Sequence, residues 1–124
     1  MLSCKTIIRN TLGYLILALN TVAANHLVPI SEVPLGEKIY HDRCEVCHGS
    51  QGDGKTFAAN ALFPPPKNFT AETTKKDLTR EQMIRSVTRG RPGTAMMPWE
   101  SVLSKLEIHS VVDYIRQALM KLQK

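Results

Sequence analysis

The sequence predicts an all-α domain. Apolar residues recur at helical spacing before residue 44, between residues 80 and 90, and after residue 104. The second and third of these segments each begin with a capping box, a Ser or Thr followed three residues later by Glu or Gln. No strand-rich stretch occurs in the chain. A packed set of helices is therefore the expected architecture.

The N-terminus is typical of a secretory signal peptide. Lys5 and Arg9 form a basic region, residues 12–19 form an apolar core, and residues 22–24 end the segment with small side chains. We expect cleavage after Ala24 and export to the periplasm. The alternative is an uncleaved membrane anchor. The eight-residue apolar core is shorter than the about 20 residues that span a bilayer as a helix.

Cleavage would remove residues 1–24 and leave a flexible lead, residues 25–33, before one domain at residues 34–124. Of the 16 basic residues two leave with the signal, so 14 remain against 11 acidic ones, a net charge near +3. That balance gives no support to nucleic-acid binding. About 100 residues are marginal for a self-sufficient apolar core, and a buried prosthetic group would make up the difference. We expect a monomer.

The first helix is predicted to start at Pro34, because proline fits the first turn of a helix. Leu35, Ile39 and Tyr40 follow at helical spacing. This helix brings the chain to Cys44.

Residues 49–76 are predicted to form a long loop. Three glycines come close together at positions 49, 52 and 54, Pro64-Pro65-Pro66 follows, and no periodicity is sustained. A loop of this length in a compact domain usually has something to wrap. A flat prosthetic group would provide it.

Two further helices are predicted from their capping boxes. Thr79 pairs with Gln82 at the start of the second helix, and Gly90 ends it. Ser104 pairs with Glu107 at the start of the last helix. The apolar stripes are Met83, Ile84 and Val87 in the second helix and Ile108, Val111, Val112, Ile115 and Leu119 in the last. The other face of the second helix carries Arg80, Arg85 and Arg89.

The segment Cys44-Glu45-Val46-Cys47-His48 has the spacing that attaches a haem covalently. Each thiol, Cys44 and Cys47, can add to one vinyl group, and His48 can then bind the iron axially. A structural zinc site needs four ligands, and no second Cys or His pair follows. A thioredoxin-like dithiol would follow a strand, whereas a helix is predicted here. One covalent haem c is therefore the predicted cofactor.

The second axial ligand is sought among the methionines and histidines. Met83 and Met120 lie at helical spacing, where methionine most often fills a core. Met96 and Met97 lie in a loop rich in proline and glycine, which can bring a thioether to an iron without breaking a helix. The histidines are weaker candidates: His41 shares the helix of Cys44, His26 lies in the lead, and His109 is remote.

Residues 34–120 resemble the class I c-type cytochromes, in particular the small bacterial monohaem ones. The shared pattern is a helix with Gly36 and Tyr40, the haem motif, a glycine-rich stretch, a Gly-Thr-Ala-Met loop and a helix bearing Val-Val-Asp-Tyr-Ile. The resemblance implies the cytochrome c fold, in which the N- and C-terminal helices cross. Gly36 and Tyr40 should there meet Val111 and Tyr114.

In that family the loop methionine binds the iron. Many members read Gly-Thr-Ala-Met, two residues and an aromatic, which selects Met96 with Trp99 as the aromatic. Other members place the ligand directly before proline, which would select Met97. We favour Met96.

The resemblance also implies contacts around the haem. A proline among residues 64–66 should turn a backbone carbonyl to the far ring nitrogen of His48, the alternative for each proline being a stiff turn alone. Asn68 or Arg91 is a candidate for binding a haem propionate, with solvated surface as the alternative for each.

A haem held by His and Met leaves no open iron position, so one-electron transfer between Fe(III) and Fe(II) remains. We expect an electron carrier without catalytic turnover of its own, serving exported or membrane-bound dehydrogenase, oxidase or reductase complexes. The alternatives are a haem-based ligand-binding or sensing protein and a small haem subunit of a larger oxidoreductase. A basic rim that steers acidic partners, or else a solvated face, is formed by Lys67, Lys75, Lys76, Arg80, Arg85, Arg89 and Arg91.

Overall fold

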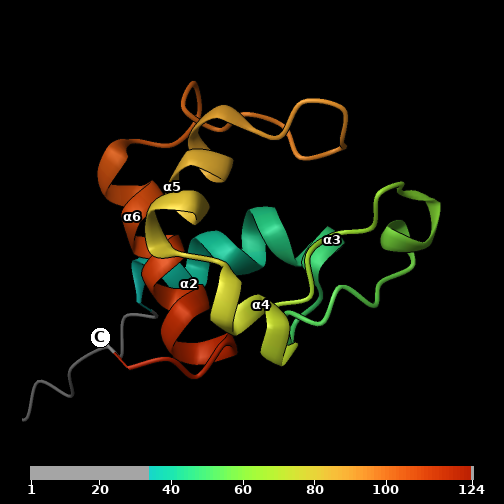
Figure 1. The fold of residues 1–124 in the computed structure, drawn as a ribbon. Helices are drawn as coiled ribbons and strands as arrows, with labels where there is room; N and C mark the ends of the chain where they lie inside the picture. The colour runs from blue at the N-terminus through green and yellow to red at the C-terminus, as the bar shows by residue number, and fades with distance from the viewer. Residues whose placement is uncertain (1–33, 124) are drawn as a thin grey trace, which may run out of the picture. The chain divides into compact units, whose positions relative to one another are not determined.

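The computed structural model describes residues 34–123, which contain helices and no strand (Figure 1). The predicted signal peptide (residues 1–24) and lead (residues 25–33) lie outside the described residues. The helices are α2 (Leu35–Ile39), α3 (Glu45–His48), α4 (Glu72–Asp77), α5 (Arg80–Arg89) and α6 (Lys105–Tyr114). Two π-helical segments, Tyr40–Cys44 and Ile115–Leu119, and one 3₁₀ turn, Ala58–Ala61, complete the elements. None of the described helices is long and apolar enough to cross a membrane.

The predicted first helix is confirmed. Pro34 is its N-cap, and helical backbone then runs through α2, the π-helical segment Tyr40–Cys44 and α3. Tyr40 is fully buried, and its hydroxyl donates a hydrogen bond to the carbonyl of Gly49 at 2.6 Å. Burial raises the pKa of this phenol, so it stays protonated and able to donate. The buried ring therefore fixes the end of the haem-motif helix.

Both capping boxes are confirmed. The backbone N–H of Gln82 donates to Thr79 Oγ1 at 3.2 Å, and the Thr79 N–H donates back to Gln82 Oε1 at 2.8 Å. Ser104 and Glu107 exchange the equivalent bonds at the start of α6, at 3.3 and 2.8 Å. Gly90 ends α5 with a positive φ of 67°, a conformation that glycine adopts without steric cost.

The prediction of an uninterrupted loop over residues 49–76 is wrong in part. The segment holds the 3₁₀ turn Ala58–Ala61 and the helix α4. The α4 sequence, ETTKKD, carries no apolar stripe, and no side chain caps its N-terminus. Thr74 is the buried residue that faces inward. Tertiary packing rather than local propensity holds this helix, which is why the pattern of apolar residues does not predict it.

The predicted crossing of the terminal helices is confirmed, with α2 packed against α6 (Figure 1). A Cβ atom added to Gly36 would lie 2.1 Å from the carbonyl oxygen of Ser110 and 3.0 Å from Tyr114 Cβ. The rings of Tyr40 and Tyr114 lie next to each other, with centroids 5.6 Å apart. Glycine at position 36 thus allows the two backbones to touch.

Helix α5 is joined to α6 by an ion pair. Arg80 Nε and Nη2 donate to the two carboxylate oxygens of Asp113 at 2.7 and 2.9 Å, the bidentate geometry that arginine forms with carboxylates. Arg116 also donates to the carbonyl of Leu78 at 3.3 Å. Arg80, which the sequence assigns to a basic rim or to a solvated face, is thus paired across the helix interface.

The core gathers around α6. Buried side chains are Ile39, Tyr40, Phe69, Met83, Val87, Leu103, Ile108, Val111, Val112, Ile115 and Met120. Met83 and Met120 are core residues, as predicted. Leu119 is only partly buried and packs against this core.

Replacing Gly36 with alanine should force α2 and α6 apart, because the atom in the way is a backbone oxygen that cannot rotate aside. We expect the free energy of unfolding to fall by about 1–3 kcal/mol, measured by chemical denaturation of the haem-loaded protein. Lys38→Ala, at an exposed position of the same helix, is the matched control. Equal stability of the two variants would contradict the close crossing.

Candidate haem site

The two thiols and the imidazole of the haem motif come from one short stretch of helix. Cys44 ends the π-helical segment, and Cys47 and His48 lie in α3. Cys44 packs against the core. Burial, with a smaller contribution from Cys47, raises the pKa of the Cys44 thiol to about 12. A reactive dithiol needs a lowered thiol pKa, so this environment argues against redox exchange.

The imidazole of His48 is held in a defined tautomer. Its Nδ1 lies 3.2 Å from the carbonyl oxygen of Lys67, and a carbonyl can only accept, so Nδ1–H is the donor. Burial lowers the pKa of His48, an effect partly offset by this hydrogen bond. The ring is therefore neutral near pH 7 and keeps its Nε2 lone pair for a metal. The carbonyl that meets His48 belongs to Lys67, which directly follows the three prolines at residues 64–66.

An aromatic ring covers one face of His48. The Phe69 ring stacks on the imidazole with centroids 4.8 Å apart and an interplanar angle of 17°, and Phe69 is buried. The hydrogen bond to Lys67 restrains the imidazole within the plane of its ring, and the stacking of Phe69 restrains the tilt of that plane. Together the two contacts fix the orientation of the imidazole. We name this arrangement the His48 clamp. Sequence reasoning missed Phe69, since nothing in the pattern distinguishes it from an ordinary core aromatic.

The glycines after the motif allow the clamp to close. The Phe69 N–H donates to the Gly52 carbonyl at 2.7 Å, and the Gly54 N–H donates to the His48 carbonyl at 2.8 Å. A Cβ added to Gly52 would lie 3.0 Å from Leu119 Cδ1 and 3.2 Å from Phe69 Cδ2. The close approach explains why small residues follow the haem motif.

The methionine loop folds back on the end of α5. The Arg91 N–H donates to the Met96 carbonyl at 2.9 Å, and the Met96 N–H donates to Thr94 Oγ1 at 3.1 Å. Gly90 is required here as well, because a Cβ there would lie 2.6 Å from the Met96 carbonyl oxygen. Met96 is partly buried and packs against the core, whereas Met97 is 69% exposed.

The rest of this loop is fixed to the body of the protein. The N–H of Trp99 donates to the Val87 carbonyl at 3.0 Å, and the indole packs against the core. The loop that carries both methionines is therefore held at its two ends.

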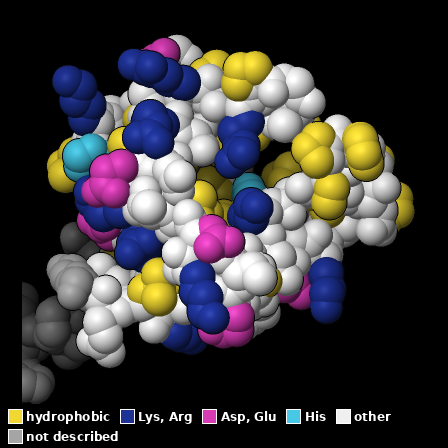
Figure 2. All heavy atoms as spheres, viewed as in Figure 1, with side chains coloured by type: hydrophobic (Ala, Val, Ile, Leu, Met, Phe, Trp, Pro, Cys, Tyr) yellow, Lys and Arg dark blue, Asp and Glu magenta, His cyan; other side chains and the backbone are white. Residues whose placement is uncertain are grey.

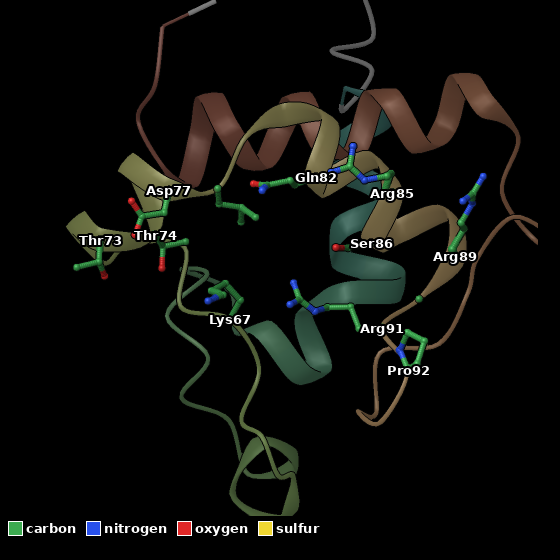
Figure 3. Close-up of a pocket in the computed structure, with 12 residues that line it drawn as sticks. Lys67, Thr73, Thr74, Asp77, Gln82, Arg85, Ser86, Arg89, Arg91 and Pro92 are labelled. Atoms are coloured by element: carbon green, nitrogen blue, oxygen red, sulfur yellow. The ribbon is translucent and has the colours of Figure 1, made fainter.

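A cavity of about 570 Å³ lies between α4, α5 and the segment that follows the motif. Figure 3 shows Gln82 and Ser86 reaching into it from α5, and Lys67 and Arg91 at its edge. The same face is hollowed in Figure 2, with hydrophobic side chains and a histidine in the hollow and Lys and Arg side chains around it. Arg91, a predicted propionate candidate, thus lines the cavity.

The other predicted candidates that the structure describes do not line this cavity. The side-chain oxygen Oδ1 of Asn68 accepts from the N–H and the hydroxyl of Thr70, at 2.8 and 2.7 Å, within a local turn. His41 is exposed and bonds to Glu45, and His109 is exposed. His26 lies outside the described residues.

The residues present fit a covalently attached haem. Two thiols and a neutral imidazole stand on one helix, a thioether loop is held at the end of another, and basic side chains that could meet carboxylates line the cavity between them. Fold and site together define a monohaem c-type cytochrome.

Residues 31–115 match a family model described as cytochrome c oxidase, cbb3-type, subunit III, and the chain belongs to this family. The chain is 37% identical over 116 residues to cytochrome c-555 of Methylococcus capsulatus (Bath), covering 90% of this chain and 84% of that protein. It is 32% identical over 81 residues to cytochrome c55X of Stutzerimonas stutzeri, covering 63% of this chain and 60% of that protein.

Two solved structures share the fold. The KustC0563 c-type cytochrome matches with a TM-score of 0.54 and 25% identity, covering 65% of this chain and 93% of that one. A chain of the Kuenenia stuttgartiensis reducing HAO-like protein complex matches with a TM-score of 0.57 and 25% identity, covering 68% and 41%. The all-α cytochrome c fold is thereby confirmed, and covalent haem c is the cofactor. Membership of this class implies haem-based electron transfer.

Phe69→Leu should release the face of the His48 ring while keeping most of the apolar volume. We expect the pattern of haem-methyl shifts in the NMR spectrum of the oxidised protein to change, because these shifts report the orientation of the axial imidazole. Loss of the stacking should also lower the free energy of unfolding by about 0.5–1.5 kcal/mol. Ile108→Val, a core change in α6, is the control: a purely structural role for Phe69 would leave both variants with the wild-type shift pattern.

Proposed function

We propose that this protein is a one-electron carrier whose haem iron is bound by His48 and Met96 and cycles between Fe(III) and Fe(II). The observation that carries the proposal is the His48 clamp, which presents a neutral, immobilised imidazole from the helix that also bears both thiols. An immobilised ligand suits electron transfer, since little rearrangement then accompanies a change of charge.

Burial favours Met96 over Met97 as the second ligand. Met96 is sheltered against the core, and its backbone is tied to Thr94 and Arg91. Met97 points its side chain to solvent and is 69% exposed. A thioether is a weak, neutral ligand that water would displace, so the sheltered sulfur is the better choice.

Held by His48 and Met96, a haem would supply a reversible one-electron couple and no site for a substrate. The residues around it then have two roles. The methionine sulfur favours the ferrous state and so raises the reduction potential. The packed side chains near the ligands, Phe69 and Trp99 among them, limit structural change between the two states. We therefore propose no catalytic turnover by this chain alone.

The proposed partners are exported or membrane-bound redox proteins. The family description names an oxidase subunit, and one structural neighbour belongs to a multiprotein complex, which supports a role beside or within a larger oxidoreductase. With Arg80 paired to Asp113, the basic side chains that line the cavity between α4 and α5 are Lys67, Arg85, Arg89 and Arg91.

Export through the first 24 residues is part of this proposal. The haem-loaded protein isolated from its own cells should begin at Asn25, as measured by intact-mass spectrometry. Retention of the N-terminal segment would instead support an uncleaved anchor.

Met96→Ala and Met97→Ala distinguish the ligand and test the closed iron site. Methionine ligation gives ferric haem a weak absorption band at the red end of the spectrum, and we expect Met96→Ala alone to lose it. The same variant should bind carbon monoxide rapidly in the ferrous state, whereas wild type should not. Loss of the band only in Met97→Ala would overturn the ligand assignment, and rapid carbon monoxide binding by wild type would favour a ligand-binding or sensing function.

A further inference from the structure

A short segment next to the haem motif exposes its apolar side chains to solvent. We name residues 57–65 the apolar lobe. Phe57 is 95% exposed and Phe63 is 94% exposed, although phenylalanine is among the residues most often buried. Figure 1 shows this segment projecting away from the helices, and Figure 2 shows hydrophobic side chains gathered on it. Two fully exposed phenylalanines on one segment are typical of an interaction site.

The lobe is anchored on the haem-bearing helix. Thr56 Oγ1 donates to the carbonyl of Cys47 at 3.5 Å and accepts from the N–H of Ala59 at 2.9 Å. The 3₁₀ turn Ala58–Ala61 packs against α3. A molecule resting on the lobe is therefore placed next to the segment that carries both thioethers and the axial histidine.

The charge around the lobe is net positive. Residues 53–71 carry two lysines, Lys55 and Lys67, and one carboxylate, Asp53, which accepts from the backbone N–H of Lys55 at 3.0 Å. Lys55, Phe57 and Pro65 border one hollow of about 490 Å³ on the lobe. An apolar side chain with a carboxylate beside it would match this combination of an apolar wall and an ammonium group.

We propose that the apolar lobe is the docking surface for a redox protein that presents an apolar patch rimmed by acidic residues. The inference rests on the proposed electron-carrier function. Two phenylalanines bury roughly 300–500 Å², about half of the 800 Å² per partner that a stable complex needs. A small contact of this kind suits an encounter that must form and dissociate for each electron.

A second copy of the chain fits this surface less well. In a twofold dimer the lysines of one lobe would face those of the other, and like charges oppose such pairing. The small area also falls short of a stable dimer interface. A partner of opposite charge satisfies both constraints.

The test uses the full chain, haem-loaded, with the double substitution Phe57→Ser/Phe63→Ser. The matched control is Val102→Ser/Leu106→Ser, which removes two other exposed apolar side chains, 58% and 70% exposed. The reduced proteins are oxidised by membrane and soluble fractions of the cells that make the cytochrome, and separately by ferricyanide. One of the two cell fractions should oxidise the reduced cytochrome. We expect the KM of that reaction to be about tenfold higher for the lobe variant than for wild type, with kcat, the ferricyanide rate and the absorption spectrum unchanged.

Lys55→Glu tests the charge. It should raise KM as well, and its effect should shrink at high ionic strength because surface charges are then screened. Val102→Ser/Leu106→Ser should behave as wild type.

Four results would overturn the assignment. An unchanged KM in the lobe variant would remove the docking role. A shifted haem spectrum or reduction potential would show that the phenylalanines pack on the haem instead. Wild-type binding to protein-free vesicles of phosphatidylglycerol, lost in the variant, would make the lobe a lipid contact, and a wild-type dimer in sedimentation equilibrium, lost in the variant, would make it a self-association surface. Failure of wild type to react with either cell fraction would instead contradict the carrier function itself.

Discussion

The structure depends on keeping the His48 imidazole neutral and fixed in direction, because only then can Nε2 bind iron with a constant geometry. Residues of the stretch after the haem motif, together with Leu119 near the C-terminus, meet this requirement. The carbonyl of Lys67 accepts the Nδ1 proton, the ring of Phe69 covers one face, and Gly52 lets Phe69 and Leu119 approach. The glycine-rich and proline-rich stretch after the motif is therefore part of the ligand support rather than a passive connection.

The ligand support in turn depends on how the helices pack. Gly36 lets α2 cross α6 with backbones in contact, and the Arg80–Asp113 pair holds α5 to α6. These two contacts set where α3, which bears the haem motif, lies relative to the end of α5, which holds the methionine loop. A small apolar core therefore suffices, because the haem adds to it.

Sequence alone predicted the features that rest on local chemistry. Capping boxes at Thr79 and Ser104 gave the starts of two helices, and the spacing of Cys44, Cys47 and His48 gave the cofactor. Features that rest on tertiary contacts were missed. Helix α4 has no apolar stripe, and the sequence does not say which residue supplies the carbonyl that meets His48, because which carbonyl turns inward depends on the fold of the whole segment. The pairing of Arg80 and the stacking of Phe69 likewise join residues far apart in the chain, which periodicity cannot connect.

The most direct test of the proposed ligation is the proton NMR spectrum of the reduced, haem-loaded protein. A methionine methyl group bound to iron lies over the face of the porphyrin, so ring-current shielding moves its resonance far upfield of all other methyl signals. We expect one such methyl resonance, assigned to Met96 through its backbone neighbours. An upfield methyl assigned to Met97 would contradict the choice of ligand, and the absence of any upfield methyl would contradict the closed, His–Met electron-transfer site.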